Sequence, residues 1–261
     1  MKTVLKLSSG RHSVEIHETG SGDNWLMFLH GAGGLLGAEV FLDLLGRDFH
    51  VIAPHLPGYG ESTGGELIED VFDAVLFYHE LMDELGIGSA HLVGHSMGGM
   101  LAAELAAFSP NRVKRLVLIA SAGLWLDEHP IPDFFSADVR ELPAMLFYDP
   151  NSPTARLLMS TPDDTEALTA MYIERSKRLA MASKFLWPIP DRGLKKRAYR
   201  IKTPTMLLWG ESDRLVPPAY ARAFQTCIRN ASVEIIPEAG HMLPYEKPEE
   251  FCKKVSGFLR S

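Results

Sequence analysis

Short apolar runs recur along the chain and alternate with longer segments in which apolar residues return every three or four positions. The apolar runs are continuous, and they fall at residues 25–29, 51–53, 91–93, 116–120, 206–209 and 233–236. Strands that read this way are buried on both faces, as in a parallel sheet covered by helices. Helical patterns occupy residues 66–85 and the end of the chain after Pro248. Alternation of strand and helix predicts an α/β architecture with right-handed crossovers.

Two parts of the chain depart from this pattern. Residues 4–7 and 13–17 alternate polar and apolar, which predicts two short antiparallel strands at one edge of the sheet. Between residues 123 and 200 prolines are frequent, no strand-like run occurs, and the clearest pattern is helical, at 164–182. The strand pattern resumes after this stretch. We therefore interpret 123–200 as a helical cap inserted into a single α/β core made of residues 1–122 and 201–261.

Composition excludes several classes of function. The chain has 261 residues, of which 46% are hydrophobic and 23% charged, as in an ordinary globular protein. Its 26 basic and 33 acidic residues give a net charge of −7, which argues against nucleic acid as a partner. The most apolar stretch, residues 116–126, is shorter than the ~20 residues of a membrane span. Because residues 1–10 also lack the apolar core of a signal peptide, we expect a cytoplasmic protein with no membrane partner.

The strongest chemical signal is the run Gly-His-Ser-Met-Gly-Gly at residues 94–99, which follows a predicted strand and opens a helix of small residues. Glycines two positions before and after Ser96 allow a strained strand-to-helix turn that presents the serine hydroxyl at the C-terminal edge of the sheet. The helix N-terminus and the amide of Met97 favour negative charge at that point, where an attacked carbonyl becomes an oxyanion.

A second signal is the loop His30-Gly31-Ala32-Gly33-Gly34, directly after the strand 25–29. Small residues let backbone amides approach a ligand, and an oxyanion hole needs a second amide besides that of Met97. We assign it to Ala32. A dinucleotide-binding loop would instead require glycine where Leu36 stands. We expect His30 to bond the loop backbone and to have no catalytic role.

Two further residues follow strand ends later in the chain. Asp213 lies just past the strand 206–209, and His241 follows the strand 233–236 after a short loop. A serine, an acid and a histidine in this order, each at the C-terminal end of a strand, meet in one cleft above a parallel sheet. Asp127 and Asp133, in the predicted cap, are the competing candidates for the acid.

Together these motifs, with Pro54-His55-Leu56-Pro57-Gly58-Tyr59-Gly60, resemble the α/β-hydrolase superfamily over essentially the whole chain. The resemblance implies an α/β-hydrolase fold: a mostly parallel eight-stranded sheet flanked by helices, with a helical cap after the sixth strand. It also implies that Ser96 is the nucleophile, that His241 is base and then acid, and that Asp213 orients the histidine. No metal or organic cofactor is implied. His55 replaces the aspartate that is usual in the family, at a position that is normally structural.

We therefore expect a serine hydrolase that cleaves small carboxylic esters through an acyl-enzyme, with the amides of Ala32 and Met97 as the oxyanion hole. Ser96 excludes the mechanism of relatives that open epoxides or displace halide with an aspartate nucleophile. A carbon–carbon bond hydrolase of ring-fission products stays open, although such relatives often have Trp after the catalytic histidine, where this chain has Met242. A cofactor-free perhydrolase and a small-ligand receptor on the same fold also stay open.

The cap is expected to roof the cleft and to line the acyl site with apolar side chains. Substitutions that change side-chain bulk there should shift the preferred acyl length. The residues chosen for this wall are Trp125, Met145, Phe147 and Trp187.

Overall fold

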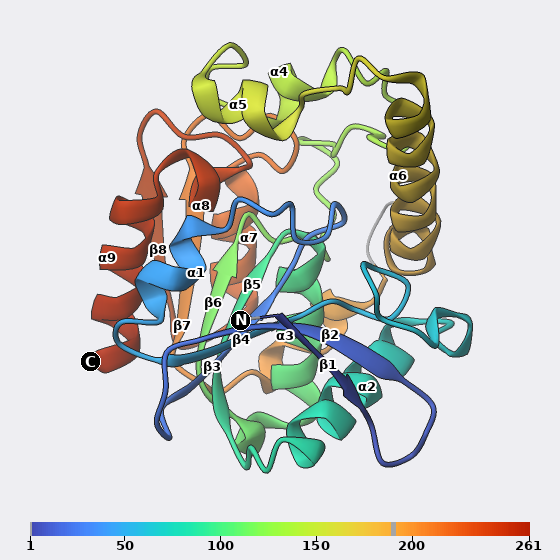
Figure 1. Cartoon of the computed structure of the whole chain (residues 1–261). Coiled ribbons are helices and arrows are strands. Elements are labelled where there is room, and N and C mark those ends of the chain that lie inside the picture. Colours follow the sequence, from blue (N-terminus) through green and yellow to red (C-terminus); the bar gives the residue numbers. More distant parts are fainter. Residues whose placement is uncertain (1, 189–191) are drawn as a thin grey trace.

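The computed structural model describes residues 2–188 and 192–261, and its centre is an eight-stranded sheet (Figure 1). The strand order is β1-β2-β4-β3-β5-β6-β7-β8. The first two strands, β1 (Lys2–Lys6) and β2 (Ser13–Thr19), pair antiparallel, and β2 is also antiparallel to β4. The other neighbours are all parallel: β3 (Trp25–Leu29), β4 (His50–Pro54), β5 (Ala90–His95), β6 (Val113–Ile119), β7 (Thr205–Gly210) and β8 (Ala231–Ile236). Each predicted strand is confirmed, and so is the mostly parallel sheet.

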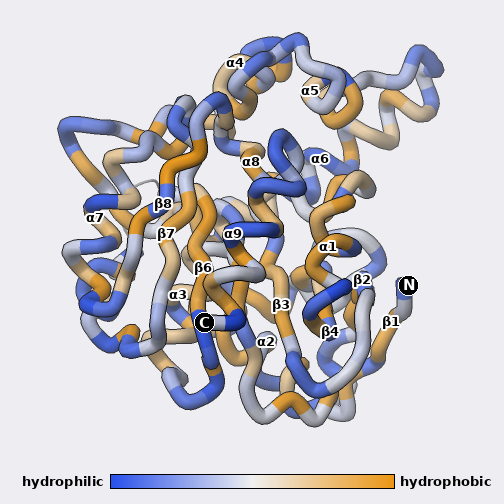
Figure 2. The backbone as a smooth tube through the Cα atoms, turned by 90° about the vertical axis from the view of Figure 1, so that its left-hand side faces the viewer, coloured by the Kyte–Doolittle hydropathy of each residue, from blue (hydrophilic) through white to orange (hydrophobic). Residues whose placement is uncertain are grey.

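Helices cover both faces of this sheet, which is why the central strands tolerate no polar alternation. Every residue of β5 and of β7 is buried. On one face α1 (Val40–Leu45) and α9 (Pro248–Arg260) pack together beside α8 (Leu243–Glu246). The other face is covered by α2 (Val71–Glu84), α3 (Met97–Phe108) and α7 (Ala219–Cys227) (Figures 1 and 2).

The predicted helix over 66–85 begins later than expected. Residues 65–67 form a separate 3₁₀ turn, and the α-helix starts at Val71. Asp70 has an extended backbone, and its carboxylate accepts hydrogen bonds from the amides of Phe72 (2.7 Å) and Asp73 (3.1 Å). This N-cap fixes the helix start. The apolar Leu67, which fits the helical period, therefore lies outside the helix.

The stretch between β6 and β7 is helical wherever it is regular. It contains α4 (Leu142–Leu146), α5 (Pro153–Leu158) and α6 (Thr165–Leu186), followed by 3₁₀ turns at Leu194–Lys196 and Ala198–Arg200. Figure 1 shows α4 and α5 above the C-terminal ends of the strands, with α6 beside them. The helical cap after the sixth strand is thus present, while its bounds as a domain, 123–200 against 1–122 and 201–261, stay a prediction.

Helix α6 is fastened to the loops beneath it. The Lys184 ammonium donates to the carbonyl oxygens of Gly65 (2.9 Å) and Ile68 (2.7 Å). The Arg178 guanidinium donates to the carbonyl oxygen of Gly33 at 3.0 Å. Among the described helices none is long and apolar enough to cross a membrane.

Candidate active site

Ser96 occupies the sharp turn that the sequence predicts between β5 and α3. Its backbone has φ 55° and ψ −118°, a conformation that residues with a side chain rarely adopt. The turn also needs glycine on both sides. A Cβ at Gly94 would collide with the carbonyl of Gly98, and a Cβ at Gly98 would collide with the carbonyls of Leu29 and His30. The Ser96 side chain is thereby directed to the C-terminal edge of the sheet, at the start of α3.

His241 and Asp213 are joined by a buried hydrogen bond. The distance from His241 Nδ1 to Asp213 Oδ2 is 2.9 Å, and both side chains are almost fully enclosed. The other carboxylate oxygen, Oδ1, accepts from the amides of Leu215 (3.0 Å) and Val216 (2.8 Å). With Nδ1–H donating to the carboxylate, the imidazole presents Nε2 as a hydrogen-bond acceptor.

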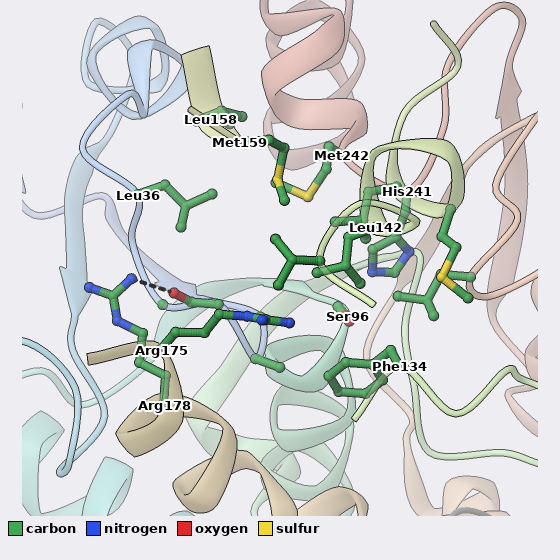
Figure 3. A pocket seen from close by; sticks show the side chains of 18 of the residues that line it. Leu36, Ser96, Phe134, Leu142, Leu158, Met159, Arg175, Arg178, His241 and Met242 are labelled. Atoms are coloured by element: carbon green, nitrogen blue, oxygen red, sulfur yellow. Dashed lines mark hydrogen bonds between the residues drawn. The ribbon is translucent and has the colours of Figure 1, made fainter. Parts of the chain in front are cut away.

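Ser96 and His241 line the same cavity of about 430 Å³, roofed by the helical stretch (Figure 3). Its wall is mainly apolar and includes Met145 and Phe147, as expected. Trp125 and Trp187 do not line it, so that part of the expected wall is wrong. The Trp125 indole instead donates to Asp127 at 2.9 Å, and Trp187 lies just past the end of α6 with half of its surface exposed.

A second, smaller cavity of about 40 Å³ also reaches Ser96. Its lining includes Met100, Gly123 and Val216, but neither His241 nor the loop of Ala32. The serine therefore faces two spaces of unequal size, and only the larger one is bounded by the histidine.

The loop after β3 passes directly beside the serine. A Cβ added to Gly31 would lie 3.3 Å from Ser96 Cβ. Ala32 lines the larger cavity, and its carbonyl is held by the Tyr59 hydroxyl at 3.1 Å. Neither the Ala32 amide nor the Met97 amide, at the start of α3, donates to an acceptor within the described chain. The roles of Ala32 and Met97 in an oxyanion hole stay a prediction.

His30 bonds the loop backbone, as the sequence analysis expected. Its Nδ1–H donates to the Gly31 carbonyl (2.8 Å), and its Nε2 accepts from the Leu56 amide (3.1 Å). Burial, aided by the charges of His55 and Arg178, lowers the pKa of His30 to about 3, so the ring is neutral at physiological pH.

The competing acids lie away from the histidine. Asp127 and Asp133 are exposed, and they accept hydrogen bonds from the Trp125 indole and from the Phe135 amide respectively. Of the three candidates only Asp213 reaches His241. Within residues 2–188 and 192–261, no group of three or more His, Cys, Asp or Glu side chains is placed to hold a metal ion.

Sequence reasoning missed two residues that hold the His241 loop. His95 Nε2 donates to the His241 carbonyl at 2.8 Å, and burial lowers the pKa of this imidazole to about 3. The Glu246 carboxylate accepts from the amides of Gly240 and Tyr148, both at 2.8 Å. Position next to Ser96 was the only available signal for His95. For Glu246 there was no signal, since its partner Tyr148 is distant in sequence.

The fold, the turn at Ser96 and the buried acid–histidine pair are those of an α/β hydrolase, and a family model described as the alpha/beta hydrolase fold matches residues 24–248. The chain therefore belongs to the α/β-hydrolase family. It is 34% identical to a dihydrolipoyllysine-residue acetyltransferase component of the acetoin cleaving system from Pseudomonas putida, over 92% of this chain and 65% of that protein. The chain thus spans less than two thirds of that relative.

Two further similarities cover nearly the whole of both proteins. A 2-hydroxy-6-oxononadienedioate/2-hydroxy-6-oxononatrienedioate hydrolase from Burkholderia vietnamiensis is 30% identical, over 95% of this chain and 91% of that one. A membrane phospholipase A of known structure superposes with a TM-score of 0.81 at 24% identity, covering 100% of this chain and 86% of that chain. The latter likeness shows the fold alone.

Proposed function

We propose that the protein is a serine hydrolase that cleaves small carboxylic esters through an acyl-enzyme intermediate. The observation that supports this most is the buried hydrogen bond between His241 Nδ1 and Asp213 Oδ2 at the cavity that Ser96 lines. An imidazole held in this way keeps its Nε2 lone pair for a proton on the cavity side. A carboxylate fixed by two amides stabilises the imidazolium that then forms.

In the proposed reaction His241 Nε2 takes the proton of the Ser96 hydroxyl as Oγ attacks the ester carbonyl carbon. The amides of Ala32 and Met97 hold the oxyanion of the tetrahedral intermediate. His241 then gives its proton to the leaving alkoxide, and the acyl group stays on Ser96. Water repeats the same steps and releases the acid.

The two cavities indicate on which side of Ser96 the alcohol part and the acyl part of the ester lie. The leaving alcohol must lie where His241 can protonate it, which is the larger cavity. The acyl group is then left with the smaller cavity of about 40 Å³, which has room for roughly a methyl or ethyl group. Met145 and Phe147, which the sequence analysis expected around the acyl group, would then lie beside the alcohol. This division favours esters of short acids with a larger, mainly apolar alcohol.

Ser96→Ala tests the proposal most simply. Members of a catalytic triad act as a unit, so loss of the hydroxyl should lower the turnover of p-nitrophenyl acetate by on the order of 10⁴–10⁶. Circular dichroism and thermal unfolding should match the wild type, because the hydroxyl faces a cavity. Retention of more than about a tenth of the activity would contradict the assignment of Ser96.

A carbon–carbon bond hydrolase is the second candidate, since the Burkholderia relative is named for such a reaction on a dienedioate. Met242 follows His241 here, where enzymes of that kind often have Trp. Steady-state assays with p-nitrophenyl acetate and with a 2-hydroxy-6-oxo-dienoate separate the two candidates. The ester proposal predicts the larger kcat/KM for the ester. Turnover of the dienoate alone would favour the second candidate.

A further inference from the structure

Among the residues that the structure describes, three charged side chains line the larger cavity, and all of them project from α6: Glu174, Arg175 and Arg178. Two of them neutralise each other. Arg178 Nε lies 3.1 Å from Glu174 Oε1, and Arg178 Nη1 donates to the Gly33 carbonyl at 3.0 Å. Apart from the histidines, the described part of the wall is left with one unbalanced positive charge, that of Arg175.

The Arg175 guanidinium has no hydrogen-bond or ion-pair partner among the residues that the structure describes. Figure 3 shows its side chain reaching from α6 across the cavity toward Ser96, while Arg178 turns away to the Gly33 carbonyl. The lining of the cavity is mostly apolar, as at Leu36, Leu142 and Met159, and its hydroxyl groups at Ser160 and Thr161 are neutral. Arg175 is half-buried there.

A guanidinium is charged at all physiological pH values and has five N–H donors in a rigid fork that matches a carboxylate. Partial removal of such a group from water without an acceptor is unfavourable. An anion inside the cavity would supply both the acceptor and the missing charge. The low polarity of the surrounding wall would strengthen the resulting pair.

From this we infer that Arg175 forms an anion subsite and that the enzyme selects esters bearing one carboxylate. The inference rests on the proposed ester hydrolysis. Because the leaving alcohol is assigned to the larger cavity, the carboxylate belongs to the alcohol part of the ester. The substrate class is thus the short-acyl ester of a hydroxy acid or a phenolic acid, with an apolar spacer between the carboxylate and the ester oxygen.

A matched pair of esters tests this directly: 4-acetoxybenzoate, which is an anion, and its neutral methyl ester. Both have the same acyl group and a similar leaving phenol. The quantity measured is the kcat/KM for the anion divided by the kcat/KM for the neutral ester. Because both variants act on the same two esters, the difference in intrinsic reactivity drops out when their ratios are compared. Arg175→Met should lower this ratio by about ten- to a hundredfold, mainly through KM for the anion. The ratio for Arg175→Lys should lie between those of the wild type and of Arg175→Met, since lysine keeps the charge but lacks the forked guanidinium.

Lys177→Met is the matched control, because it removes the same charge from an exposed position of the same helix. It should leave the ratio unchanged. An unchanged ratio in Arg175→Met, or an equal fall in Lys177→Met, would overturn the anion subsite while leaving ester hydrolysis intact. If the wild type hydrolyses neither ester nor p-nitrophenyl acetate, the proposed function itself fails.

Discussion

Two buried histidines hold the loops around the proposed catalytic groups without being charged themselves. His30 bonds the loop that contains Ala32, and His95 bonds the carbonyl of His241. Burial lowers the pKa of each to about 3, in His95 with a contribution from the charge of His241. Each ring is therefore a neutral, fixed hydrogen-bonding group at pH 7.

This burial predicts a loss of stability in mild acid. The folded pKa of about 3 lies below the ordinary value of 6.5, so the unfolded chain takes up the proton first as the pH falls. The contribution of His95 is present in full above pH 6.5. It is lost at about 1.4 kcal/mol per pH unit as the pH falls from 6.5 toward 3.

Urea unfolding of the wild type and of His95→Gln between pH 7.5 and 5 measures this contribution. Glutamine keeps an N–H donor for the His241 carbonyl but does not titrate. The free energy of unfolding of His95→Gln should therefore fall with a shallower slope, by about 1.4 kcal/mol per pH unit. Parallel slopes would show that His95 is not buried in its neutral form.

For single residues, the sequence predicted a role where a chemically suitable residue type lies in a recognisable local turn. Ser96 could be predicted because glycines surround it at a strand end. Asp213 could be preferred over Asp127 only by its closeness to a strand, since the pairing with His241 depends on how two distant loops meet. Arg175 gave no signal at all, because a cation on a polar helix looks like any exposed residue until the helix is placed above the cavity.

At the scale of elements, α4 is tied to the loops that hold the acid and the histidine. Arg214 Nη1 donates to the carbonyls of Ala144 (2.9 Å) and Phe147 (3.1 Å). The Met242 amide donates to the Leu146 carbonyl at 3.0 Å. The Glu246 carboxylate accepts from the Tyr148 amide, just past α4, and from the Gly240 amide, next to His241. The wall formed by α4 is therefore fixed in place relative to His241.

Glu246→Gln should weaken this junction, because one of the amides of Gly240 and Tyr148 would then face an NH₂ group. A net hydrogen bond contributes about 0.5–1.5 kcal/mol, and because one of these bonds is part-buried and the other exposed, a loss of about this size should appear as a lower free energy of unfolding in urea. We also expect a lower kcat for p-nitrophenyl acetate with a smaller change in KM, because His241 is displaced and the cavity is not blocked. Glu249→Gln, exposed in the first turn of α9, is the control. Equal stability of the two variants would argue against the junction.

The helices and strands were predictable from the hydrophobic pattern. Errors arose where a polar side chain determines where a helix begins or which neighbour a residue contacts. Apolar spacing placed a helix over 66–85, but the Asp70 side chain starts it at Val71. The two tryptophans expected in the cavity wall, Trp125 and Trp187, do not line it. Trp125 is instead drawn to Asp127, a contact between neighbours that periodicity does not reveal.

At the scale of the whole molecule, a parallel sheet brings the ends of β5, β7 and β8 to one edge, which is why the order of serine, acid and histidine could be read from the sequence. The shape of the space above that edge could not. It depends on how α4, α5 and α6 lie across it. Helices α4 and α5, with 5 and 6 residues, are too short to show a helical period, and in the long α6 only Met181, Ala182 and Phe185 are buried.

The two unequal cavities predict a steep preference for short acyl groups. For p-nitrophenyl esters, kcat/KM should fall as the acyl chain grows from acetyl to octanoyl, because the smaller cavity of about 40 Å³ is filled early. Ile131→Ala, at a half-buried position of its lining, should shift the preference toward longer chains. Met145→Ala, in the larger cavity, should not. A wild type that prefers octanoyl esters would place the acyl group in the other cavity.

Whether an acyl group is held on Ser96 can be measured without any assumption about the natural ester. The protein is mixed with p-nitrophenyl acetate, quenched in acid within the first turnover, and analysed by intact and peptide mass spectrometry. We predict a mass increase of one acetyl group on the peptide that contains Ser96, together with a burst of p-nitrophenol no larger than one per active site. Both should be absent in Ser96→Ala. Steady turnover of the ester with no adduct, or with the acetyl group on another residue, would contradict an acyl-enzyme on Ser96.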